Sequence, residues 1–174
     1  MATKSAKQTV WDMVLSMAVI GIFVAVIYVF IPHDESEDPL KRVDYTVELD
    51  SARRAAPYRI AAPEGLPERW KPTSVTYDAD SPQGAAWHLG YLDPDEQYVA
   101  VEQSDGEPAE FIESVSQGAE NTGETRRVAG EEWERYEGEK YDALVREERG
   151  VTTVVTGTAS YERLVKMAAA LRTS

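Results

Sequence analysis

Residues 86–102 have the sequence AWHLGYLDPDEQYVAVE, in which two apolar stretches flank the polar tetrad DPDE at residues 93–96. Proline at the second position of such a tetrad favours a turn, and aspartate stabilises turns through local hydrogen bonds. A connection this short joins two strands only in antiparallel pairing. The stretch therefore predicts adjacent antiparallel strands at residues 86–92 and 97–102.

Similar patterns on both sides of this hairpin extend the predicted sheet. Residues 43–49 alternate apolar and polar side chains with a period of two, and β-type runs separated by turn residues lie at residues 73–77, 125–128, 132–136, 141–146 and 151–156. Helices are expected after Pro108 and after Ser160, because apolar side chains recur there at helical spacing. The four prolines between residues 57 and 72 indicate a loop, which Leu66 and Trp70 would pack against the domain.

An apolar segment, MVLSMAVIGIFVAVIYVFI, occupies residues 13–31 and is long enough as a helix to span a bilayer core of about 30 Å. Lys4 and Lys7 precede it and acidic residues follow it, so the positive-inside rule places residues 1–12 in the cytoplasm. The alternative, a cleaved signal peptide, has a shorter apolar region. We expect a single-pass membrane anchor, an acidic tether at residues 32–42 and an extracytoplasmic domain at residues 43–174.

These patterns together predict the fold class. It is α+β, with an antiparallel sheet of about six to seven strands and helices packed against it, plus one N-terminal transmembrane helix. The small pair Gly21 and Ala25 has the spacing that lets two such membrane helices approach closely. These residues are candidates for a contact with a second copy or with a partner helix, and the simpler interpretation is that they face lipid.

The composition excludes several functional classes. The chain has 31 acidic and 18 basic residues, a net charge of −13 and no cysteine. This charge argues against nucleic-acid binding, and the absence of cysteine excludes disulfides and thiolate chemistry. His88 is the one histidine of the folded part, and the nucleophile-elbow, zincin and phosphate-loop motifs are absent. We therefore expect no metal, no cofactor and no enzymatic activity, with His88 as a structural or solvent-facing residue.

Aromatic residues offer the best candidate surface. Trp87 and Tyr91 share one face of a predicted strand, whereas Trp133 and Tyr136 fall on opposite faces of another, so that one of those two rings is expected to be exposed. The simplest interpretation is core packing beneath the helices. The alternative is that the four rings line a cleft for a ligand or partner.

Four segments carry a family resemblance. They are KQTVWDMVLSMAVIGIFVAVIYVFIPHD, RRAAPYRIAAPEGLPERWKPTSVTY, WHLGYLDPDEQYVAVEQSD and VTTVVTGTASYERLVKMAAAL. In this order the chain resembles the actinobacterial domain-of-unknown-function family 4245, which implies a membrane-anchored protein of high-GC Gram-positive bacteria and no established activity. The order of strands and helices is also similar to the Mog1/PsbP-type sandwich of exported actinobacterial lipoproteins.

Three hypotheses follow. The leading one is a non-enzymatic binding or assembly module of the cell envelope, which recognises an envelope protein or a small apolar ligand. The second is an accessory subunit that docks a larger membrane protein through its transmembrane helix. The third is an envelope hydrolase that uses carboxylates, near His88.

Overall fold

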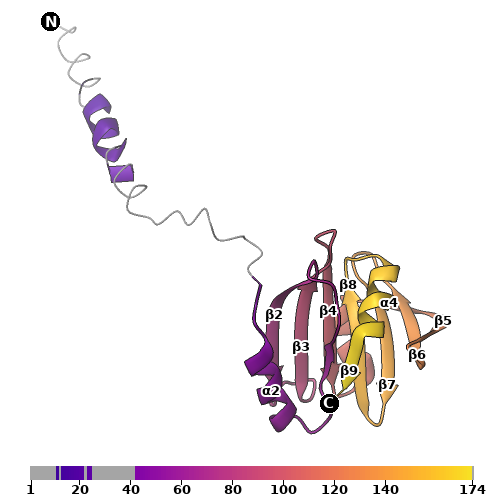
Figure 1. Ribbon diagram of the computed structural model, residues 1–174. Coiled ribbons are helices and arrows are strands. Elements are labelled where there is room, and N and C mark those ends of the chain that lie inside the picture. The colour runs from indigo at the N-terminus through magenta and orange to yellow at the C-terminus, as the bar shows by residue number, and fades with distance from the viewer. Residues whose placement is uncertain (1–10, 12, 22, 25–41, 174) are drawn as a thin grey trace, which may run out of the picture. The chain divides into compact units, whose positions relative to one another are not determined.

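The computed structural model describes residues 11, 13–21, 23–24 and 42–173. The chain forms two units, residues 1–39 and 40–174. Within the second unit, a seven-stranded antiparallel sheet has the strand order β2-β3-β4-β8-β7-β6-β5, and a separate two-stranded sheet pairs β1 with β9 (Figure 1). The α+β class and the antiparallel sheet expected from the sequence are confirmed.

The elements have the following bounds. The strands are β1 (Ala61–Pro63), β2 (Lys71–Asp78), β3 (Ala86–Leu92), β4 (Tyr98–Ser104), β5 (Glu120–Val128), β6 (Glu131–Glu137), β7 (Asp142–Glu148), β8 (Val151–Gly157) and β9 (Leu171–Thr173). The helices are α2 (Thr46–Ala55), α3 (Pro108–Ser116) and α4 (Tyr161–Ala170).

The predicted hairpin is present as β3 and β4, which pair antiparallel from Ala86 opposite Ser104 to Leu92 opposite Tyr98. Its turn is held by Asp93, whose carboxylate accepts hydrogen bonds from the backbone N–H groups of Asp95, at 2.8 Å, and Gln97, at 2.9 Å. The aspartate therefore acts as expected, by satisfying backbone donors of the turn.

The strand expected at residues 43–49 is wrong, because most of this segment belongs to α2. Asp44 accepts hydrogen bonds from the Thr46 N–H group, at 3.0 Å, and the Thr46 hydroxyl, at 2.7 Å, directly before the helix. Leu49 and Ala52, three residues apart, are buried, whereas Val47 is 72% exposed. The period-two alternation thus misled the prediction, since only the helical spacing of Leu49 and Ala52 is used for packing.

The expectation of a transmembrane helix over residues 13–31 is corrected by the structure. No helix among the described residues is both long and apolar enough to cross a membrane. The contact considered for Gly21 and Ala25 is not tested by the structure, because Ala25 and residues 26–31 lie outside its described part.

Each face of the large sheet has its own core. On the first face, α2, α4 and the β1-β9 pair cover the sheet (Figure 1). Its buried residues include Trp87, Leu89, Val101, Val155 and Leu164. On the second face, α3 packs against β7, β8 and β4, and Phe111, Ile112, Ala143, Val145 and Val154 form a smaller core. Because α3 covers this half only, side chains of β2 and β3 on the second face stay accessible.

The indole of Trp87 joins β1 to the first core. Its ring N–H donates to the Ala61 carbonyl at 3.0 Å, and its side chain is fully buried. We expect Trp87→Phe to lower the free energy of unfolding by about 2 kcal/mol, because the variant loses this hydrogen bond and leaves a cavity. Urea unfolding would measure the loss. The exposed Val47→Ala is the control and should change stability by less than about 0.5 kcal/mol; an equal loss in both variants would contradict the assignment.

Candidate functional site

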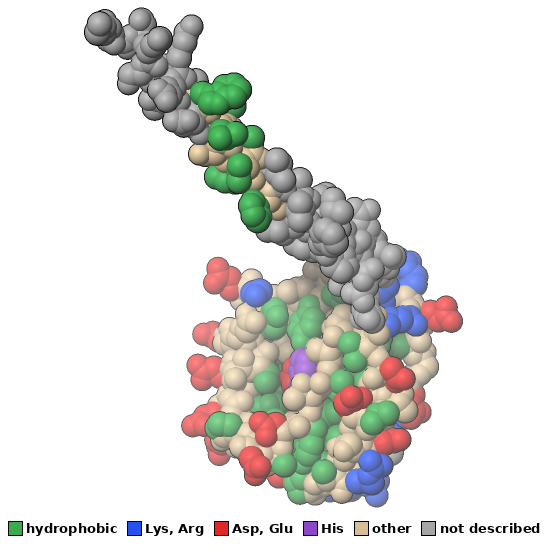
Figure 2. Space-filling model, turned by 90° about the vertical axis from the view of Figure 1, so that its left-hand side faces the viewer, with side chains coloured by type: hydrophobic (Ala, Val, Ile, Leu, Met, Phe, Trp, Pro, Cys, Tyr) green, Lys and Arg blue, Asp and Glu red, His purple; other side chains and the backbone are tan. Residues whose placement is uncertain are grey.

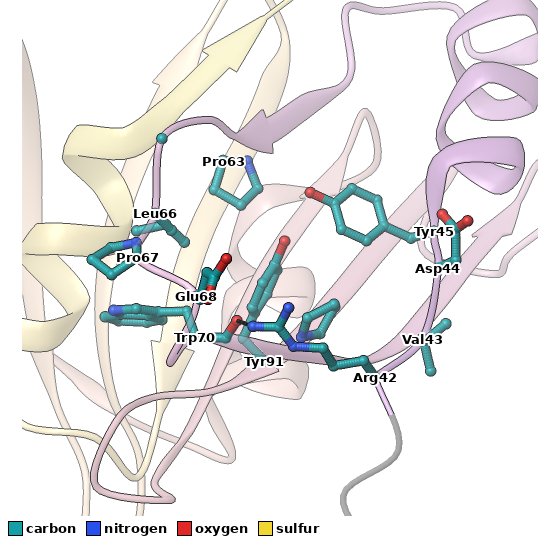
Figure 3. A pocket seen from close by; sticks show the side chains of 12 residues that line it. Arg42, Val43, Asp44, Tyr45, Pro63, Leu66, Pro67, Glu68, Trp70 and Tyr91 are labelled. Carbon is teal, nitrogen blue, oxygen red and sulfur yellow. Dashed lines mark hydrogen bonds between the residues drawn. The ribbon is translucent and has the colours of Figure 1, made fainter.

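A pocket of about 440 Å³ lies between the start of α2, β3 and the proline-rich segment that precedes β2. Pro63, Leu66, Pro67 and Trp70 form its apolar side, while the hydroxyl groups of Tyr45 and Tyr91 point into it from the opposite side (Figure 3). Arg42 lies at the edge of the pocket, with its guanidinium 3.5 Å from the Trp70 carbonyl oxygen. The volume is in the range of small-molecule sites.

Tyr45 and Tyr91 form the polar centre of the pocket. Their rings meet edge to face, with centroids 6.1 Å apart. Burial, followed by the hydrogen bond to Tyr45, raises the pKa of Tyr91 well above its ordinary value, although the nearby Arg42 lowers it in part. The Tyr91 hydroxyl therefore stays neutral at physiological pH and can both donate and accept a hydrogen bond.

The four predicted aromatic residues lie in different surroundings. Trp87 and Trp133 are buried within the first core. Tyr91 is almost buried, but its hydroxyl reaches the pocket. Tyr136 is partly buried against the second core. The structure thus does not gather the four rings into one cleft, and Trp133 and Tyr136 both pack, on opposite faces of the sheet.

A polar network lies on the second face of the sheet, near His88. The Ser74 hydroxyl is 2.8 Å from His88 Nε2, and His88 Nδ1 is 2.6 Å from a carboxylate oxygen of Glu102. The His88 side chain is 29% exposed and that of Glu102 is 12% exposed; the histidine is visible in purple at the surface in Figure 2. Hydroxyl, imidazole and carboxylate are thus joined in series, which is the arrangement of a nucleophile, a base and an orienting acid.

Strand register brings these three side chains together. His88 pairs directly with Glu102 on β4, whereas Ser74 on β2 pairs with Gly90. Between Pro72 and Ser74 the register shifts by one residue. Pro72 pairs with Tyr91, on the first face, so this bulge is what moves Ser74 to the face of His88.

Gly90 leaves the space that the Ser74 side chain needs. A Cβ atom at this position would overlap the Ser74 oxygen and would lie 3.2 Å from the hydroxyl oxygen of Tyr98. The side chains of Tyr98 and Ser74 thus lie beside each other over Gly90. Burial and the charge of Glu102 raise the pKa of Tyr98 to about 12, so its hydroxyl remains protonated. The site therefore holds a neutral phenol beside Ser74.

The electrostatics of the network depend on Glu102. Burial raises the pKa of Glu102, and the contact with His88 offsets part of that rise. For His88, burial by itself lowers the pKa, but the hydrogen bond and the charge of Glu102 outweigh it and raise the pKa above 6.5. The two groups thus stabilise each other's charged form.

The sequence analysis named His88 but missed Ser74 and Glu102. Fourteen positions separate His88 from each of them, so their contact follows from strand pairing and not from a local motif. The predicted strands at residues 86–92 and 97–102 would have placed Val101, and not Glu102, opposite His88, because the observed turn is one residue longer and Leu92 pairs with Tyr98. Ser74 had no such signal, because the bulge that places it is not visible in the sequence pattern.

We expect NMR titration to show His88 with a pKa above 6.5, the ordinary value of the side chain. In Glu102→Gln the pKa should fall below that value, because burial then acts without the compensating charge. The chain has two histidines, so His88→Asn identifies the signal and His33 serves as the internal control. An unchanged His88 pKa in Glu102→Gln would contradict the coupling.

Comparison with known proteins identifies a family but no activity. Residues 6–171 match the family described as a protein of unknown function, DUF4245. No curated protein matches the chain. The match covers nearly the whole chain, in agreement with the resemblance carried by the four sequence segments. The chain therefore belongs to the DUF4245 family.

Proposed function

We propose that the domain is a binding module and that the pocket between Tyr45, Tyr91 and Trp70 holds its ligand. The observation that carries this proposal is the convergence of two tyrosine hydroxyls and a guanidinium on one apolar-walled pocket. Ligand sites in proteins commonly combine apolar walls with a few polar groups that fix orientation. The ligand is a small apolar molecule that carries a hydrogen-bond acceptor.

The apolar part of the ligand would lie against the proline-rich segment. Pro63 and Trp70 are buried and thus fixed, while Leu66 is partly buried and Pro67 is exposed at the rim. Trp70 also anchors the segment through the backbone hydrogen bond from its N–H to the Pro67 carbonyl, at 2.9 Å. A wall held in this way loses little conformational entropy when a ligand binds.

The polar part of the ligand would meet Arg42 and the two tyrosines. Arg42 donates only, and the tyrosine hydroxyls are neutral donors. Glu68 and Asp44 also line the pocket and would repel an anion. This balance of groups favours a neutral acceptor, such as a carbonyl or ether oxygen, over a strongly charged ligand.

In-cell photocrosslinking tests the pocket. A photoreactive amino acid at Leu66, on the pocket wall, should give a defined small-molecule adduct that intact-mass spectrometry detects. Tyr91→Phe should reduce the yield about tenfold, because one lost hydrogen bond in a binding site is worth about 1 to 1.5 kcal/mol.

The matched control places the same probe at Val47, which is exposed on α2. An adduct at Leu66 but not at Val47 supports the proposal. A protein crosslinked at Leu66 would show that the pocket binds a protein partner and not a small molecule. Equal labelling at both positions, or a Leu66 adduct that is unaffected by Tyr91→Phe, would contradict the pocket as the binding site.

The location of the domain in the cell envelope stays a prediction, as do an envelope partner, an actinobacterial origin and the likeness to Mog1/PsbP-type domains. The net charge of −13 argues against nucleic-acid binding, and a domain without cysteine does not depend on a reducing compartment.

We expect alkaline phosphatase fused after Ser174 to be active, because that enzyme matures only outside the cytoplasm, where its disulfides form. An inactive phosphatase fusion together with a fluorescent cytoplasmic reporter fusion would contradict the prediction.

A further inference from the structure

We propose that Ser74, His88 and Glu102 form a catalytic triad that hydrolyses esters of short carboxylic acids. The site lies on the second face of the sheet, whereas Tyr91 and the proposed binding pocket lie on the first. This activity goes beyond the proposed binding function and departs from the expectation that the chain is not an enzyme.

The three residues have the geometry that acyl transfer requires. The oxygen of Ser74 is within hydrogen-bond reach of His88 Nε2, and the other ring nitrogen is held by Glu102. The partly exposed imidazole is open to a substrate, while the carboxylate behind it is almost buried. Glu102 is a positioning residue: it keeps the Nδ1 proton on the far side of the ring, so that Nε2 is free to accept the serine proton.

The reaction balances with water as the only co-reactant. The Ser74 oxygen attacks the ester carbonyl carbon and passes its proton to His88 Nε2. The bond from that carbon to the alcohol oxygen then breaks, and His88 returns the proton to the departing alcohol. Water, deprotonated by His88, attacks the acyl-serine, and the carboxylic acid leaves as the proton returns to Ser74.

Tyr98 supplies the donor for the negative oxygen that develops during attack. Its hydroxyl lies beside Ser74, and its pKa of about 12 keeps the proton in place at physiological pH. A neutral phenol in this position can donate to the oxyanion in the way that side-chain donors do in other acyl-transfer sites. The ring of Tyr141 lies against that of Tyr98, with centroids 6.1 Å apart, and so restricts its orientation.

The surroundings of Ser74 limit the acyl group to a short chain. Gly90 and Ala100 lie opposite each other on neighbouring strands of this face, and both are buried. The Tyr98 ring passes close to Gly90, so it occupies the space in which a longer acyl chain would lie. The alcohol side faces solvent at His88, so it carries no comparable size limit.

The test uses the full chain and a fluorophosphonate, which reacts with an activated serine hydroxyl. Peptide mass spectrometry should locate one adduct, on Ser74. His88→Gln should slow labelling at least about a hundredfold, because general-base assistance is lost. Hydrolysis of p-nitrophenyl acetate should fall by a similar factor in Ser74→Ala, whereas p-nitrophenyl octanoate should be a poor substrate of the native chain.

The matched control is Ser114→Ala, which removes an exposed serine of α3 and should leave both rates unchanged. Glu102→Gln should shift the pH profile of kcat/KM to lower pH as well as lower its maximum, a change that a merely structural role would not produce. Circular dichroism checks that each variant folds. No adduct on Ser74 of the native chain, or labelling that is insensitive to His88→Gln, would overturn the proposal.

The two proposals fail separately. Tyr91→Phe changes the binding pocket on the first face and should leave ester hydrolysis unchanged. Gly90→Ala should abolish hydrolysis by displacing the Ser74 side chain, while the crosslink at Leu66 persists. Loss of both ester hydrolysis and the Leu66 crosslink in either variant would show that the variant had unfolded. The fluorophosphonate result on the native chain would then decide whether Ser74 is catalytic.

Discussion

The side-chain alternation of β3 determines which residues lie on each face of the sheet. Trp87, Leu89 and Tyr91 are all buried on the first face of the sheet, so His88 and Gly90 must lie on the second. A shift of β3 by one residue would expose three large side chains, which would cost several kcal/mol in lost burial. Core packing on one face thus fixes the polar network on the other.

The polar network of Ser74, His88 and Glu102 lowers the free energy of unfolding rather than raising it. A carboxylate as buried as Glu102 loses hydration, and its pairing with His88 repays that loss only in part. The raised pKa of Glu102 expresses this cost directly. Carboxylate and imidazole groups with perturbed pKa values cluster at functional sites, which makes this network a candidate site.

The helices cover only part of the second face of the sheet, and this leaves the polar network accessible. On the second face, α3 covers β7, β8 and part of β4 but does not extend over β2. On the first face, α2 packs against β2, and the segment between β1 and β2 folds beside it to form the pocket. The same pair of strands, β2 and β3, therefore contributes to both candidate sites, one on each face.

Local signals in the sequence were sufficient to predict several elements of the fold. Turn chemistry at Asp93 and Pro94, glycines between strands and helical spacing after Pro108 and Ser160 predicted the antiparallel sheet and two of its helices. Local pattern failed at residues 43–49 and at residues 13–31, where alternation and apolar length pointed to a strand and to a membrane helix. The contact between Ser74 and His88 could not be predicted in this way, because a single bulge in β2 sets the face of that serine, and a bulge depends on how the strand pairs with its neighbour.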